Sequence, residues 1–142
     1  RTMDINLTAP MVLCRDFARR CIEARRGGVI LNVASQAAFG GATSGHADYA
    51  ASKAALVNLT RTLARELSRK GVRVNALAPG MMETGMSEAA LAERREQYVE
   101  RIPIGRIADP AEVADVAVFL CSRRARYMTG ATIDVSGGML MH

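Results

Sequence analysis

The sequence predicts an α/β fold built on a parallel sheet, and three observations lead to that prediction. Helical and strand patterns alternate along the 142 residues, the strand patterns are short and apolar, and glycine or proline bounds them. Helices that connect successive strands return the chain by right-handed crossovers. The strands should therefore lie parallel, with helices layered on the sheet.

The first helix and strand occupy the first quarter of the chain. A helix is expected over residues 4–26, ending at Gly27 and Gly28. Pro10 lies inside that span and should kink the helix or mark where the regular helix begins. Residues 29–33 are an apolar run with one asparagine, which is typical of a strand buried on both faces.

The most regular helical pattern falls at residues 47–69. Its leucines recur at steps of three and four along one face: Leu56, Leu59, Leu63 and Leu67. Lys70 and Gly71 end this helix. Residues 72–77 predict a second strand, which Pro79 and Gly80 stop.

The last third of the chain predicts two helices and a strand. Residues 87–100 are rich in Glu and Arg and indicate an exposed helix or a mobile flap. A capping signature follows, made of Asp109, Pro110, Ala111 and Glu112, and the apolar set Val113, Val116, Ala117 and Leu120 continues it at helical spacing. Thr132–Val135 is the last expected strand, before Gly137 and Gly138.

The composition favours one soluble globular domain, because 49% of the residues are hydrophobic and 23% are charged. No apolar run approaches the ~18 residues that a membrane span needs. Cys14, Cys21 and Cys121 are odd in number and lack metal-site spacing, so we expect neither disulfides nor a bound metal. Cys14 and Cys21 are seven apart, near one face of a helix, and should be packing residues. A reducing cytoplasm fits this cysteine content.

The net charge is +5, and the arginines form two groups: Arg15, Arg19, Arg20, Arg25 and Arg26, then Arg123, Arg124 and Arg126. No aromatic residues are interleaved with them for base stacking, so we do not expect nucleic acid as a partner. A solvated helix face is the favoured interpretation, and an acidic protein carrier is the functional alternative.

The clearest chemical motif is Tyr49 with Lys53. On a helix, residues four apart share a face, so the phenol and the ammonium should converge on one site. An ammonium ~4 Å from a phenolate stabilises it by a few kcal/mol at an effective dielectric of ~20. A phenol so placed can give a proton to a carbonyl oxygen or take one from an alcohol near neutral pH.

The surrounding residues resemble the short-chain dehydrogenase/reductase family. The resemblance rests on Asn32 to Ser35 followed by Tyr49 to Lys53, on Asn6 with Leu7, on Asn75 to Gly80 followed by Thr84, and on Tyr127, Thr129, Gly130, Asp134, Gly137 and Gly138. It implies the C-terminal half of a Rossmann-like, doubly wound parallel sheet with helices on both faces. The glycine-rich phosphate loop of the family is absent from these residues. The chain also begins inside a predicted helix, so we expect residues 1–142 to be part of one domain in a longer polypeptide.

The resemblance also implies roles for individual residues. Tyr49 would be the acid/base. Lys53 would favour the phenolate form and hold the cofactor ribose. Ser35 would position the reacting oxygen, and Asn6 would hold a water that links Lys53 to solvent. The nicotinamide pocket would be lined by Pro79, Gly80, Met82 and Thr84, and substrate would meet Ser35, Gln36, His46 and Tyr49.

Within the family, the features look most like 3-oxoacyl-[acyl-carrier-protein] reductases, which reduce a carbonyl with NADP or NAD. Two alternatives are a polyol or sugar dehydrogenase of the same family, and a non-catalytic nucleotide-binding homologue or inert fragment. We expect a small carbonyl or alcohol substrate, with delivery on an acidic acyl carrier protein as one route. We expect neither nucleic acid nor a membrane as a partner. A cytoplasmic homo-oligomer, a tetramer, is the expected assembly.

Overall fold

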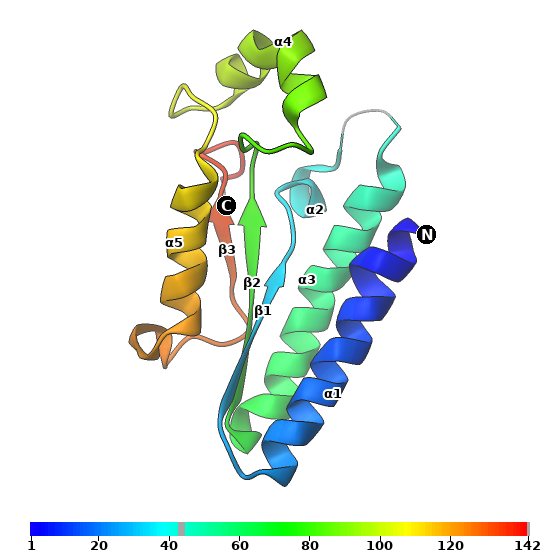
Figure 1. The fold of residues 1–142 in the computed structure, drawn as a ribbon, viewed down its shortest axis with the longest axis vertical. Coiled ribbons are helices and arrows are strands. Elements are labelled where there is room, and N and C mark those ends of the chain that lie inside the picture. Colours follow the sequence, from blue (N-terminus) through cyan, green and yellow to red (C-terminus); the bar gives the residue numbers. More distant parts are fainter. Residues whose placement is uncertain (43–44, 142) are drawn as a thin grey trace.

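The structure is a computed structural model that describes residues 1–42 and 45–141. Its described strands form one parallel sheet in the order β1-β2-β3: β1 is Gly28–Val33, β2 is Val72–Pro79 and β3 is Thr132–Val135. Helices α1 (Ala9–Glu23) and α3 (Ala47–Leu67) lie on one side of this sheet, and α5 (Pro110–Cys121) lies on the other (Figure 1). The predicted parallel sheet with helices on both faces is confirmed.

The first helix differs from its predicted bounds at both ends. Residues Asp4–Thr8 form a π-helical turn, and the regular α-helix begins at Ala9, so Pro10 marks the start of α1. The α-helix ends at Glu23 rather than at residue 26, because Arg25 takes a left-handed backbone conformation (φ 49°). Gly28 serves packing instead of helix termination. A Cβ there would lie 2.8 Å from Cys21 Sγ, so glycine lets the end of α1 approach β1.

The second helix and strand follow the prediction closely. After α3, a 3₁₀ turn (Ser68–Lys70) leads to Gly71, whose φ of +80° requires glycine. β2 runs two residues further than expected, through Pro79. Proline lacks an N–H but is tolerated at this strand end, where its carbonyl still accepts a hydrogen bond from Gln36 N (3.0 Å).

Helix α5 begins at the predicted capping box. Asp109 accepts a hydrogen bond from Ala111 N (2.8 Å), and Glu112 accepts one from Asp109 N (3.0 Å). Val113 and Leu120 are buried against the sheet, as the spacing predicted. The other predicted helix of this region is α4 (Glu88–Arg101), which breaks at Arg94 and stands beyond the carboxyl ends of the strands (Figure 1). It is not wholly exposed, because Leu91 is buried.

Two apolar clusters hold the layers together. The cluster between the sheet and the α1–α3 side consists of Cys14, Ala18, Cys21, Ile30, Ala64, Leu67, Val72 and Val74. The cluster under α5 is built on Leu77, Val113 and Leu120. Cys14 and Cys21 are therefore packing residues, as expected, whereas Cys121 is exposed. Within the described part of the chain, no helix is both long and apolar enough to cross a membrane.

Candidate active site

The ends of β1 and β2 place Ser35 and Gln36 at the carboxyl edge of the sheet. Hydrogen bonding to β2 continues beyond β1, because Ala34 N donates to Leu77 O (2.7 Å) and Gln36 N donates to Pro79 O (3.0 Å). Ser35 Oγ accepts a hydrogen bond from Ala37 N (3.2 Å), at the start of the short helix α2 (Ala37–Gly40). Open parallel sheets bind their ligands at this edge.

Tyr49 and Lys53 lie on the first turns of α3, and both side chains are half-buried. Lys53 Nζ donates a hydrogen bond to Val33 O (2.8 Å), which joins the helix to the last residue of β1. The same nitrogen lies 5.7 Å from the centre of the Tyr49 ring. Burial lowers the pKa of the Lys53 ammonium. The two side chains thus share one site next to the strand that leads to Ser35.

Asn6 reaches the same helix from the π-helical turn. Its Nδ2 donates to Ser52 Oγ (3.1 Å), so the side chain bonds to protein rather than facing solvent. Ser52 Oγ in turn donates to Tyr49 O (2.7 Å). Because Pro10 has no N–H, the Asn6 carbonyl cannot make the usual i to i+4 helical bond. The π-helical turn uses i to i+5 bonds instead, as Ala9 N donates to Asp4 O.

The segment after β2 contains the residues expected to line a nicotinamide pocket. Gly80 passes so close to the end of β3 that a Cβ would lie 2.8 Å from Ser136 Cα. Met82 bridges to Ala108 by backbone pairing, and its side chain packs in the cluster under α5. Thr84 N donates to Ser87 Oγ (3.0 Å), which fixes the turn that carries Thr84. These residues lie in one connected segment that starts at the carboxyl end of β2.

The other two residues predicted to contact substrate are Gln36 and His46, and they differ in burial. Gln36 is half-buried at the start of α2, whereas His46 is exposed immediately before α3. Hydrogen bonds from Thr2 and from Tyr49 N lower the pKa of Asp48, which also lies in the first turn of α3. Residues 43 and 44, between Gln36 and His46, lie outside the described residues.

Three residues of this framework were not identified from the sequence. Ser52 links Asn6 to α3, and Ser87 holds the turn at Thr84. Arg73 donates hydrogen bonds to the carbonyls of Leu120, Ser122 and Met128, which fixes the end of α5 to β2. Ser52 lies within the Tyr49 to Lys53 motif, but its partner Asn6 is 46 residues away, so no local signal pointed to that bond. The partners of Ser87 and Arg73 give no local signal.

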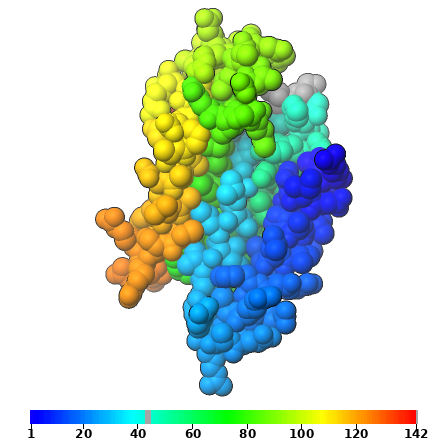
Figure 2. All heavy atoms as spheres, in the orientation of Figure 1, coloured from blue at the N-terminus to red at the C-terminus, as the bar shows by residue number. Residues whose placement is uncertain are grey.

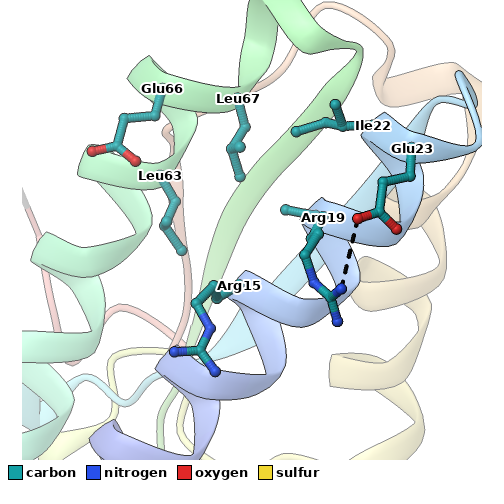
Figure 3. A pocket seen from close by; sticks show the side chains of 8 residues that line it. Arg15, Arg19, Ile22, Glu23, Leu63, Glu66 and Leu67 are labelled. Carbon is teal, nitrogen blue, oxygen red and sulfur yellow. Dashed lines mark ion pairs between the residues drawn. The ribbon is translucent and has the colours of Figure 1, made fainter.

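Two surface grooves lie away from this edge. One, of about 390 Å³, lies between α1 and α3 and is lined by Arg15, Ala18, Arg19, Ile22, Glu23, Leu63, Glu66 and Leu67 (Figure 3). The other, of about 420 Å³, lies where β1 and β2 begin. Neither groove is lined by Ser35, Tyr49 or Lys53, so the candidate site rests on side-chain chemistry and position, not on concavity. Among the described residues, no cluster of His, Cys, Asp and Glu could hold a metal ion.

The residues at this edge fit the nicotinamide and ribose end of a dinucleotide. Among the described residues, the Lys53 ammonium makes one hydrogen bond, which leaves two of its three N–H donors for ribose hydroxyls. The sequence contains no Gly-x-Gly-x-x-Gly motif of the kind that binds a pyrophosphate. The donor set therefore suits one end of such a cofactor.

A parallel sheet covered on both faces, with Ser35, Tyr49 and Lys53 near its carboxyl edge, defines a Rossmann-like α/β protein of the dinucleotide-binding kind. The family model described as enoyl-(acyl carrier protein) reductase matches residues 1–140. The chain belongs to the short-chain dehydrogenase/reductase family, as the motifs predicted.

Curated relatives and solved structures agree with this assignment. The chain is 42% identical over 137 residues to the 3-oxoacyl-[acyl-carrier-protein] reductase FabG of Aquifex aeolicus. The aligned residues make up 96% of the chain and 54% of that protein. The FabG of Vibrio cholerae is 41% identical over 139 residues, 98% of the chain and 56% of the relative. The chain thus spans little more than half the length of the curated relatives it matches.

Three solved structures are similar in fold. A proposed 2-deoxy-d-gluconate 3-dehydrogenase of Agrobacterium tumefaciens with bound NADP has a TM-score of 0.92 and 40% identity, covering 96% of this chain and 56% of that one. Sorbitol-6-phosphate 2-dehydrogenase SrlD of Erwinia amylovora has a TM-score of 0.91 and 29% identity (99% and 59%). A 4-hydroxyisoleucine dehydrogenase complexed with NADH has a TM-score of 0.90 and 31% identity (96% and 57%).

Proposed function

We propose that these residues are the C-terminal, catalytic part of a single domain in a longer NAD(P)-dependent oxidoreductase. The reaction is the interconversion of a carbonyl and a secondary alcohol. The observation that carries the proposal is the position of the Lys53 ammonium, 5.7 Å from the Tyr49 ring and bonded to the end of β1. Relatives of about twice this length are consistent with a missing N-terminal dinucleotide-binding half.

Each polar residue has a distinct role in this proposal. When bound, the nicotinamide would supply or receive the hydride. Tyr49 gives a proton to the substrate oxygen during reduction, and Lys53 favours the phenolate left behind while holding the ribose. Ser35 donates a hydrogen bond to the reacting oxygen and orients it. Asn6 holds a water on the path from Lys53 to solvent. Pro79, Gly80, Met82 and Thr84 line the nicotinamide side.

The substrate we favour is a 3-oxoacyl thioester, because the similar curated relatives are named 3-oxoacyl-[acyl-carrier-protein] reductases. The second candidate is a sugar or polyol dehydrogenase, which the Agrobacterium and Erwinia structures favour. A non-catalytic homologue is disfavoured, since a binding module needs no Tyr–Lys pair beside a serine.

Nicotinamide absorbance on the full-length protein tests this function. We expect NADPH or NADH consumption with 3-oxoacyl thioesters at a kcat/KM well above that with any sugar or polyol. Faster turnover of a sugar or polyol would replace the first candidate with the second. No turnover of any substrate in either direction, together with retained cofactor binding, would favour the non-catalytic homologue.

The arginines at the end of the molecule opposite the candidate site are the groups that an acidic carrier would contact. Arg25 and Arg26 follow α1, Arg123, Arg124 and Arg126 follow α5, and both segments lie toward the end away from α4 (Figures 1 and 2). The 420 Å³ groove lies between them. None of these arginines forms a salt bridge among the described residues, so their charge is available to a partner.

Charge reversal tests the carrier. Arg123→Glu with Arg126→Glu should raise the KM for a carrier-bound substrate and leave the KM for a small thioester analogue unchanged. The matched control is Arg61→Glu with Arg65→Glu, at exposed positions on α3. Equal KM values for the carrier-bound substrate in all three proteins would contradict carrier docking on the arginines that follow α5.

A further inference from the structure

Two buried hydroxyls on α3, those of Ser52 and Thr60, have the same kinds of hydrogen-bond partner. Each donates to a backbone carbonyl of its own helix and accepts from the amide of an asparagine side chain. Ser52 Oγ donates to Tyr49 O (2.7 Å) and accepts from Asn6 Nδ2 (3.1 Å). Thr60 Oγ1 donates to Leu56 O (2.9 Å) and accepts from Asn32 Nδ2 (2.9 Å). Both side chains are fully buried. They differ in what their helical turn carries, because only the turn of Ser52 carries Tyr49 and Lys53.

Ser52 and Lys53 are neighbours in sequence but bond to different segments. Ser52 Oγ is bonded to Asn6 in the π-helical turn, whereas Lys53 Nζ is bonded to Val33 O at the end of β1. The single hydroxyl proton of Ser52 and one of its lone pairs are both used. The result is a hydrogen-bond chain from the Asn6 amide, through Ser52, to the backbone of Tyr49 itself.

The turn at the other end of that chain is irregular. Asp4–Thr8 is π-helical and Pro10 removes one backbone donor, so local hydrogen bonding alone fixes this turn weakly. The turn contains no buried residue that could anchor it by packing. The Asn6–Ser52 bond therefore supplies a specific attachment of this turn to the start of α3.

We propose that Ser52 is a positioning residue for the reaction: its hydroxyl holds the turn bearing Asn6 in register with the helical turn bearing Tyr49 and Lys53. The inference rests on the proposed function, in which Asn6, Tyr49 and Lys53 take part in the same reaction. Ser52 touches neither substrate nor cofactor. Its loss should displace the proton path while leaving the binding groups in place.

The test compares Ser52→Ala with Thr60→Val in the full-length enzyme. Each variant deletes one buried hydroxyl and leaves an asparagine amide without its acceptor, so both should lower Tm. Only Ser52→Ala should lower kcat, by about tenfold, because small displacements of reacting groups have costs of that order. It should also shift the pH profile of kcat, with KM and cofactor Kd changed less than twofold. Asn6→Ala added to Ser52→Ala should cause little further loss.

Hydrogen exchange measures the same coupling without turnover. In Ser52→Ala, amides of residues 1–8 and 47–53 should exchange faster together, whereas Thr60→Val should leave both segments as in the wild type. If Ser52→Ala does not fold, Ser52→Cys takes its place, with a smaller loss expected from the weaker S–H donor. Wild-type kcat and pH profile in the Ser52 variant, or equal kcat losses in the Thr60 variant, would overturn the proposal. An inactive wild type would refute the proposed function alone, and the exchange result would still decide the coupling.

Discussion

At the scale of single residues, the structure places a cation next to a phenol. Lys53 is bonded to the Val33 carbonyl and partly buried, and burial lowers the pKa of its ammonium. A charge removed from water interacts more strongly with a neighbouring phenolate than an exposed one does. The hydrogen bond to the Val33 carbonyl holds the ammonium in place before substrate binds.

The chain contains two lysines, which gives Lys53→Met a matched control. Loss of the ammonium should weaken cofactor binding by about tenfold or more, since hydrogen bonds from a charged donor contribute roughly 1.5–3 kcal/mol. It should also lower kcat. Fluorescence titration of NADPH with the full-length variant measures the first effect. The control is Lys70→Met, on the exposed turn after α3, which should bind cofactor like the wild type. Equal Kd values for the two variants would contradict the role of Lys53.

The positions of Tyr49, Lys53 and Ser35 were predictable because their signals are local. The four-residue spacing sets a common helix face, and a serine that follows an apolar strand lies at the sheet edge. The bond from Asn6 to Ser52 joins residues 46 apart, so it depends on how α1 and α3 pack and not on either segment alone. The exposed position of His46 depends on the path of its loop, which spacing does not encode.

At the scale of elements, α5 is fixed at both ends by charged side chains. Its beginning has the capping box, in which Arg106 Nη2 also bonds Glu112 Oε1 (2.6 Å). Its end is held by Arg73 from β2. The capping box was readable from the sequence, since its residues lie within four positions. Arg73 was not, because its acceptors are backbone carbonyls that lie close only in the folded protein.

The capping box predicts a specific pH dependence. Hydrogen bonds from Arg106 and from Asp109 N lower the pKa of Glu112 to about 2. Because the folded value lies below the unfolded one, near 4.5, this carboxylate stabilises the fold above about pH 4.5 and loses that effect as the pH falls toward 2. Glu112→Gln should therefore lower Tm at pH 7, and its Tm should converge on the wild-type value near pH 2.

Thermal unfolding of the full-length proteins between pH 7 and 2.5 measures that convergence. The control is Glu96→Gln, an exposed glutamate on α4 for which the described residues provide no ion pair. It should change Tm little at any pH. A Tm difference for Glu112→Gln that stayed constant down to pH 2.5 would contradict the role assigned to this carboxylate.

At the scale of the whole molecule, the faces of α1 and α3 suggest assembly. The groove between them is lined by Ile22 and Leu63 beside Arg15, Arg19 and Glu66 (Figure 3). Other large apolar side chains on α1 are also exposed, among them Met11, Leu13 and Phe17. We predict a homo-oligomer of the full-length protein, a tetramer with closed symmetry, in which these helices pack on a second copy.

Light scattering at micromolar concentration should give the mass of the oligomer. Ile22→Glu should reduce that mass, because a charge placed in an apolar helix interface is costly to bury. Met86→Glu, at a position 93% exposed before α4, should leave the mass unchanged. A monomeric wild type would contradict the prediction.

The open side of the sheet leads to a second prediction at this scale. β1 is an edge strand in the described structure, and Val33 on it is 53% exposed. An uncovered apolar edge promotes aggregation. Residues 1–142 expressed alone should be insoluble or molten and should not bind dinucleotide tightly. A cooperative thermal transition with micromolar NAD(P) affinity in this isolated segment would contradict that expectation.

The central claim is that Tyr49 is the acid/base of a carbonyl-reducing site, and Tyr49→Phe in the full-length enzyme tests it most directly. The substitution keeps the ring and removes only the hydroxyl, so the fold and cofactor affinity should persist. Stopped-flow nicotinamide absorbance should show a hydride-transfer rate at least ~100-fold below the wild type. Tyr127→Phe, at a fully exposed position, should react at the wild-type rate. A Tyr49→Phe enzyme that transfers hydride at near the wild-type rate would contradict the account.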